Sequence, residues 1–180
     1  MKNKLEISYL GHEILRATAK PVVDIEDKSF QKLIDDMMYT VKAAKGLGIA
    51  APQVYQQQCL FIMASKPSVR YPNAPTMEPI AIINPQITNY YGSIVKDWEG
   101  CLSIPGIRGH VPRYTHIDVI YTDRKGNKIE KTLHHFIARI FQHEIDHLNG
   151  IVFLDRLETN TDIITEQVYQ ELVTNKAKNI

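Results

Sequence analysis

Residues 143–147 have the side chains and the spacing of a catalytic metal site. They read HEIDH, so His143 and His147 stand four positions apart with Glu144 between them. Residues four apart share one face of an α-helix, which lets both imidazoles bind one metal ion. A glutamate beside the first histidine can act as general base towards a water on that metal. The pattern therefore predicts metal-dependent hydrolysis.

The alternative is that these histidines are satisfied polar groups inside an ordinary core. Residues 134–148 carry apolar side chains on nearly every face of the helix they are expected to form, which is typical of a buried helix. Burying two imidazoles and a carboxylate without partners would cost roughly several kcal/mol. A bound metal removes that cost, so the metal site is favoured over the packed core.

The third metal ligand is not settled by spacing. A catalytic metal commonly has three protein ligands and one open position. Cys101 is one candidate, because Gly100 before it lets the backbone approach a ligand closely. A lone cysteine is more often a small buried apolar residue, which is the role expected of Cys59. The other candidates are the downstream carboxylates Asp155, Glu158, Glu166 and Glu171.

Three helices are expected to position these residues. Asp27 or Ser29 can begin the first, which is amphipathic, and Gly46 can end it. The second is the buried helix with HEIDH, which Asn149-Gly150 can end. The third is an amphipathic helix near the C-terminus. Their expected ranges are 27–45, 134–148 and 161–176.

The expected strands are short. Residues 59–63 and 80–83 are apolar runs, the second closed by Asn84-Pro85, and residues 116–122 and 128–133 flank a turn as a hairpin. Residues 65–77 hold three prolines and are expected to be a loop. Because strands and helices do not alternate, we expect an α+β fold. In it, antiparallel β-sheets pack around a central buried HExxH helix, with an amphipathic helix in the N-terminal half and a C-terminal helix. The whole chain, 1–180, would be one domain with a helical tail over about 159–180.

Composition excludes several classes of protein. The 180 residues include 21 Lys and Arg against 20 Asp and Glu, a net charge of +1, and 44% are hydrophobic. This excludes a strongly basic nucleic-acid binder and an acidic disordered chain, and no DNA partner is expected. Two cysteines cannot form a disulfide framework, which indicates a reducing compartment or a metal-binding role for a cysteine. Without a signal peptide or a run of about 20 apolar residues, a cytoplasmic protein without a membrane partner is expected.

Three segments together resemble the peptide deformylase family. Its Gly-x-Gly-x-Ala-Ala-x-Gln, Glu-Gly-Cys-Leu-Ser and Gln-His-Glu-x-Asp-His-Leu motifs match residues 46–53, 99–103 and 142–148 in identity, order and separation. The resemblance extends from about residue 9 to about residue 157. One departure is His135, where family members often have glycine.

The resemblance implies a reaction and a cofactor. A divalent metal, natively Fe²⁺ and replaceable by Ni²⁺, Co²⁺ or Zn²⁺, would activate a water that attacks the formyl group of N-formylmethionyl nascent peptides and releases formate. Glu144 would be the general acid and base. Gln53 and the backbone N–H of Leu102 would hold the oxyanion. The implied metal ligands are Cys101, His143 and His147.

The resemblance also implies surrounding contacts. Glu99 and Arg113 would support the cysteine segment, the alternative being a surface ion pair. The C-terminal tail could contact the ribosome near the exit tunnel. The residues expected to contact the substrate are Leu47, Gly48, Gly100, Phe136 and Ile140, for some of which core packing is the alternative.

Two other functions remain open on the residues alone. A metalloendoprotease would take its third ligand downstream and would not need Cys101. A structural metal or redox module would have a closed four-ligand site, with Cys59 or His110 as the extra ligand. An inactive relative is the remaining alternative, although every catalytic position of the motifs is present.

Overall fold

The computed structural model describes residues 2–67, 71 and 74–178. Within them the α-helices are α1 (Lys28–Ala43), α2 (His135–Leu148) and α3 (Glu166–Lys178). The strands are β1 (Gly48–Ala50), β2 (Leu60–Ser65), β3 (Met77–Cys101), β4 (Ile104–Thr122), β5 (Lys128–His134) and β6 (Ile163–Thr165). A short 3-10 helix, η2 (Ala51–Val54), follows β1 directly.

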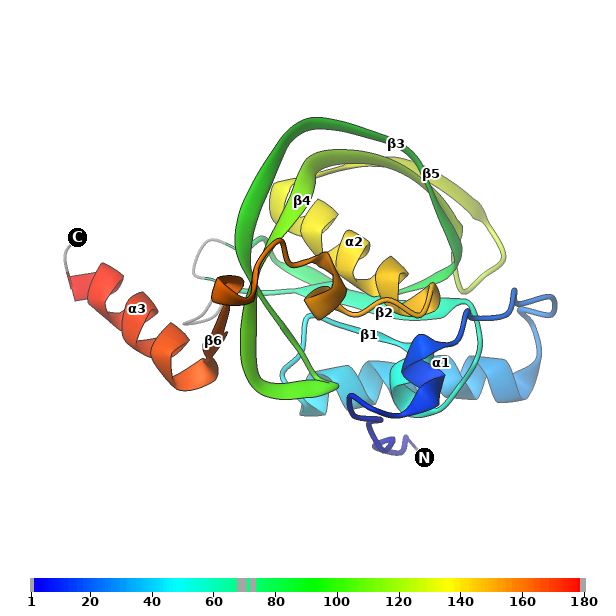
Figure 1. The fold of residues 1–180 in the computed structure, drawn as a ribbon. Helices are drawn as coiled ribbons and strands as arrows, with labels where there is room; N and C mark the ends of the chain where they lie inside the picture. The colour runs from blue at the N-terminus through cyan, green and yellow to red at the C-terminus, as the bar shows by residue number, and fades with distance from the viewer. Residues whose placement is uncertain (1, 68–70, 72–73, 179–180) are drawn as a thin grey trace.

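The strands form one antiparallel sheet in the order β1-β2-β3-β4-β5, with β6 added on β4. Figure 1 shows β3, β4 and β5 arching over α2, while α1 lies below β1 and β2. The predicted α+β class, with an antiparallel sheet and three helices, is confirmed.

The helix α1 covers one face of the sheet with an apolar stripe. Asp27 caps it, because its carboxylate accepts a hydrogen bond from the Phe30 N–H at 2.8 Å. Phe30, Ile34, Met37 and Val41 are buried in one cluster with residues of β1 and β2. The expected helix is present, although it ends at Ala43, before Gly46.

The strand β3 corrects the expectation of a short strand ending at Asn84-Pro85. It continues to Cys101, passing from β2 to β4 through a register shift between Ile83 and Gln86. Asn84 has a left-handed backbone, φ 49°, and its side-chain amide exchanges two hydrogen bonds with the Val22 backbone. A proline is tolerated at such a bulge because no ladder hydrogen bond is lost there. The long strand therefore reaches the centre of the molecule.

The helix α2 packs its apolar side chains against the concave side of the sheet. Phe141 meets Phe61 of β2 edge to face, with ring centroids 5.1 Å apart. The helix starts one residue later than expected, at His135, whose φ is 48°. The expected hairpin of residues 116–122 and 128–133 is confirmed within β4 and β5.

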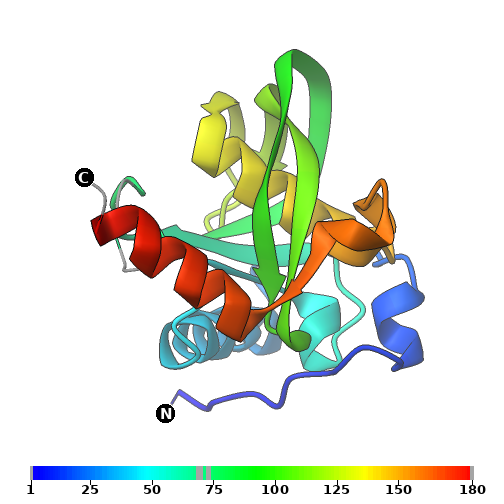
Figure 2. The ribbon, with the colours of Figure 1, turned by 60° about the vertical axis from the view of Figure 1, so that its left-hand side comes forward.

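The C-terminal part corrects a second expectation. Residues 161–165 are not α-helical. A 3-10 helix (Asn160–Asp162) is followed by β6 (Ile163–Thr165), which pairs with residues 107–109 of β4, and α3 begins only at Glu166. An edge of β4 offers backbone hydrogen bonds there, which side-chain periodicity does not reveal. Figure 2 shows α3 along the outside of the sheet. Residues 179–180 of the expected tail lie outside the described residues.

The expected loop over residues 65–77 lies partly outside the described residues. Of those described, residues 66, 67, 71 and 74–76 belong to no helix or strand, while Ser65 and Met77 end β2 and begin β3. In the described part of the chain, no helix is long and apolar enough to cross a bilayer.

Candidate active site

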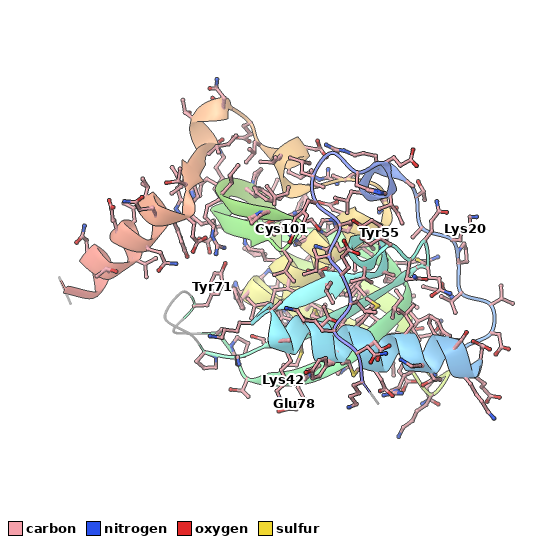
Figure 3. All side chains as sticks on the ribbon, turned by 90° about the horizontal axis from the view of Figure 1, so that it is seen from below. Lys20, Lys42, Tyr55, Tyr71, Glu78 and Cys101 are labelled. Carbon is pink, nitrogen blue, oxygen red and sulfur yellow. The ribbon has the colours of Figure 1, made fainter. Side chains whose placement is uncertain are left out.

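Three potential metal ligands converge where the end of β3 meets α2. His143 and His147 lie one turn apart on α2, and Cys101 is the last residue of β3. The Cys101 Sγ lies 3.2 Å from the His147 Nε2, and the ligand atoms of all three residues lie within 4.8 Å of one another. Figure 3 shows Cys101 in the middle of the molecule.

The downstream carboxylates have other partners and are not part of this cluster. Asp155 pairs with Arg16, Glu158 with Lys96 and Glu166 with Arg108, while Glu171 lies near Gln167 on α3. The extra ligands considered for a closed site are also engaged: Cys59 packs against the core, and His110 stacks on Trp98 at 4.8 Å. Among the described residues, the metal-competent group is the Cys101, His143 and His147 cluster.

The Glu99 carboxylate orients His143, the first histidine of the motif. Its Oε2 lies 2.9 Å from the His143 Nδ1, which leaves Nε2 of that ring for a metal. Arg113 donates two hydrogen bonds to the same carboxylate, at 3.0 and 3.1 Å. Burial alone would raise the Glu99 pKa, but Arg113 and His143 lower it below its usual range. The pair is buried, so the alternative of a surface ion pair is wrong.

Sequence reasoning missed three members of this network, two of them on α2. Arg139 donates from Nη1 to the Glu99 Oε1 at 2.8 Å, and Asp146 accepts from Arg113 at 2.5 Å. Arg156 also donates to Asp146, at 2.6 Å. The available signal was the presence of an arginine and an aspartate in a buried helix, because buried charges require partners.

Removing Arg113 should destabilise the protein. Arg113→Met leaves Glu99 and Asp146 with fewer partners, and breaking such a buried pair costs about 3–5 kcal/mol. We expect the lower end, because Arg139 and Arg156 still hold the two carboxylates. Urea unfolding measures the loss. The control is Arg124→Met, whose pair with Asp35 is over a third exposed and is worth under about 1 kcal/mol. Equal losses would contradict this account.

The Glu144 carboxylate is buried beside β1. Burial raises the pKa of Glu144 to about 7, and its Oε2 has no hydrogen-bond partner among the described residues. Its side chain occupies the space where a Cβ on Gly48 would stand. The glycine at that position is therefore required by the carboxylate, in addition to any contact with a substrate.

Gln53, in η2, faces the cysteine. Its Oε1 accepts from the Ala50 N–H at 2.7 Å, which holds the amide in place. Its Nε2 lies 3.3 Å from the Cys101 Sγ and donates to the Ser103 Oγ at 3.1 Å. The side chain thus binds a backbone N–H of the chain and also directs an N–H donor towards Cys101.

Two of the three ligands, Cys101 and His143, border a cavity of about 580 Å³. Leu47, Gly48, Leu102, Phe136 and Ile140 all line it, as do Gln53, Glu99, Gly100 and Glu144. The space above Gly100 is taken by the Arg108 guanidinium, which also lines the cavity and was not among the expected residues. The fold therefore places the expected acid–base and substrate-contacting residues around one space, together with Cys101 and His143.

The donor set fits a divalent transition metal. Burial raises the pKa of the Cys101 thiol, but attraction to His147 and His143 outweighs this effect and lowers it to about 5. A thiolate and two imidazoles suit such metals, and the unpartnered Oε2 of Glu144 is available to a water beside the ion. These features define a hydrolase-type site with three ligands on an α+β scaffold.

Comparisons with known proteins identify the family. The family model for polypeptide deformylase matches residues 4–162. A peptide deformylase 2 from Nostoc sp. is 56% identical over 174 residues, covering 97% of each chain. The chain belongs to the polypeptide deformylase family, hydrolases that remove the N-terminal formyl group from polypeptides.

Solved structures agree with this assignment. A Met-ala-ser-bound class I type b peptide deformylase from Acinetobacter baumannii is 40% identical, with a TM-score of 0.85 over 87% of this chain and 100% of that one. A peptide deformylase from Synechococcus elongatus in complex with actinonin is 34% identical, with a TM-score of 0.78 over 97% of this chain and 86% of that one.

Proposed function

We propose that this chain removes the formyl group from N-formylmethionyl nascent polypeptides and releases formate, using one divalent metal ion. The observation that carries the proposal is the convergence of Cys101, His143 and His147 beside the unpartnered Glu144 carboxylate. The three ligands would hold the ion, which when bound polarises the formyl carbonyl and activates a water. Fe²⁺ is the proposed native ion, and Ni²⁺, Co²⁺ or Zn²⁺ can replace it.

Glu144 moves the proton. Its carboxylate takes a proton from the attacking water and returns it to the departing amine, so it serves as base and then as acid. A pKa near 7 suits both roles, because the group then changes protonation state readily at neutral pH. Burial against Gly48 fixes the carboxylate in one position.

Gln53 and Leu102 stabilise the negative charge that develops on the formyl oxygen. The Gln53 Nε2 is already directed at the cysteine by the hydrogen bond that its Oε1 accepts from the Ala50 N–H. The Leu102 N–H follows Cys101 directly in the chain. Fixed donors of this kind cost no reorganisation during the reaction, and losing one lowers kcat by about 10²–10³-fold.

The substrate's methionine side chain takes the apolar part of the cavity. Leu47, Phe136 and Ile140 supply that surface. The peptide backbone lies along the glycine-containing segment of residues 46–48 and pairs with it as an added strand. Because nascent chains carry the formyl group, we place the enzyme in the cytoplasm near the ribosome exit tunnel.

Formate release tests the proposal. The protein is prepared without oxygen and given formyl-Met-Ala-Ser. We expect steady release of formate, loss of release after chelation, and recovery with about one equivalent of Fe²⁺ or Ni²⁺ per chain. Unformylated Met-Ala-Ser is the matched control and should remain intact. Cleavage of that control would indicate a peptidase, and a folded, metal-loaded protein that releases no formate would contradict the proposal.

A further inference from the structure

The helix α3 reaches the cavity through one ion pair. Glu166, its first residue, lines the cavity, and its Oε2 accepts from the Arg108 Nε of β4 at 2.5 Å. The guanidinium of Arg108 also lies 4.9 Å from the ring centre of Tyr169, one turn along α3. Two side chains of a helix on the outside of the sheet (Figure 2) therefore hold a side chain that lines the cavity.

Arg108 occupies a position where small shifts alter the cavity. Its guanidinium fills the space over Gly100, the residue before the metal ligand Cys101. Its Nη1 donates to the Tyr71 hydroxyl at 3.2 Å, and the Tyr71 ring contacts Phe136 with centroids 4.9 Å apart. Figure 3 shows Tyr71 on the side of the molecule where α3 lies. The side chain of Arg108 thus joins α3 to both the metal-ligand strand and the apolar wall.

Burial makes Arg108 depend on its carboxylate partner. Its side chain is 6% exposed, and a guanidinium out of water is stable only when it is paired and hydrogen-bonded. If Glu166 is replaced by a neutral residue, the buried Arg108 guanidinium loses its ion-pair partner. Movement of the guanidinium into water or into the open cavity then becomes more favourable. Either movement changes the polar wall that lies beside the apolar surface proposed for methionine.

We propose that Glu166 is a positioning residue that holds Arg108 in the cavity wall, so that α3 sets the affinity for the part of the peptide that follows formylmethionine. This inference rests on the proposed function. The formyl group and the methionine side chain are assigned to the metal ligands and the apolar wall. The remaining, charged part of the cavity wall, Arg108 and Glu166, would then contact the polar backbone of the substrate residues that follow formylmethionine.

The test compares two substrates that share the reacting group. Formyl-Met-amide ends at methionine, whereas formyl-Met-Ala-Ser continues past it. For Glu166→Gln, we expect the ratio of kcat/KM for the longer substrate to that for the shorter one to fall about tenfold, carried by KM. Glu171→Gln, on an exposed position of the same helix, is the matched control and should leave the ratio unchanged.

The chain's single tryptophan provides a second readout that does not need turnover. Trp98 lines the cavity and lies 6.3 Å from the Tyr169 ring on α3, so its emission reports on the helix and the wall together. Titrating the metal-loaded protein with the product Met-Ala-Ser should change that emission. The midpoint should move to about tenfold higher peptide concentration in Glu166→Gln and stay in place in Glu171→Gln.

Each outcome decides the proposal. A lower substrate ratio together with a shifted midpoint in Glu166→Gln alone supports it. An unchanged ratio, or equal loss of kcat on both substrates, overturns it, because Glu166 would then be inert or merely structural. If the wild-type protein released no formate, the proposed function would fail separately. The tryptophan titration would then decide alone, and equal midpoints would overturn the positioning role.

Discussion

Glu144→Gln should lower kcat for deformylation by about 10²–10⁴-fold, the usual contribution of a positioned general acid and base. Glutamine has nearly the same shape as glutamate, so it fits the space beside Gly48 but cannot accept and return a proton. Glu144 is not one of the three clustered ligands, so the variant should still bind one metal ion per chain. Formate release and metal analysis on the same sample measure the two properties.

The stability of this variant provides an internal check. The pKa of Glu144 is raised to about 7 because burial disfavours its ionised form. A neutral glutamine escapes that penalty, so the metal-free variant should unfold at an equal or higher temperature than the metal-free wild type. Glu158→Gln, at a side chain that is 63% exposed, is the control and should change neither rate nor stability. A Glu144→Gln protein with normal kcat would remove the general base from the mechanism.

Gly48→Ala should have an effect of similar size from a single added methyl group. The new Cβ would overlap the Glu144 carboxylate and force it to move. The backbone of Gly48 is outside the left-handed region, so alanine meets no conformational penalty there and the cost comes from the contact. Displacing a catalytic group by about 1 Å costs about 10²-fold in rate. We expect kcat to fall by at least that factor while metal content is retained.

Gly46→Ala is the matched control for this prediction. Its Cβ would lie 3.1 Å from the Val41 Cγ2 and 3.2 Å from the Leu102 Cδ1, so these methyl groups need to move by only a few tenths of an ångström. We expect a loss of activity well under tenfold. Equal losses in the two variants would mean that the segment tolerates no side chain at all, and the specific contact with Glu144 would lose its support.

The local elements follow from the order of side chains along the chain. The spacing of Phe30, Ile34, Met37 and Val41 defines α1, and the apolar residues of 134–148 define a buried helix, because a helix repeats every 3.6 residues whatever surrounds it. The same periodicity put His143 and His147 on one face. The three motifs also indicated the family, which the comparisons confirmed.

Other features depend on contacts between distant segments. Asn84-Pro85 is locally a strand terminator, and only the hydrogen bonds of Asn84 to Val22 and the change of partner from β2 to β4 carry β3 on to Cys101. Residues 163–165 become a strand because β4 offers them a free edge. Backbone pairing of this kind leaves little trace in side-chain periodicity.

The support of the site also depends on the folded chain. Motif spacing left one cysteine and four carboxylates as candidates for the third ligand. Of these five, the fold brings only Cys101 to the two histidines, and the four carboxylates contact other side chains. Three of the supporting ion pairs join distant parts of the chain: Arg113 and Asp146 are 33 residues apart, Glu99 and Arg139 are 40 apart, and Arg108 and Glu166 are 58 apart. Helical spacing fixes which side chains share a face. The pairing of charges in a low-dielectric interior is instead set by the path of the whole chain.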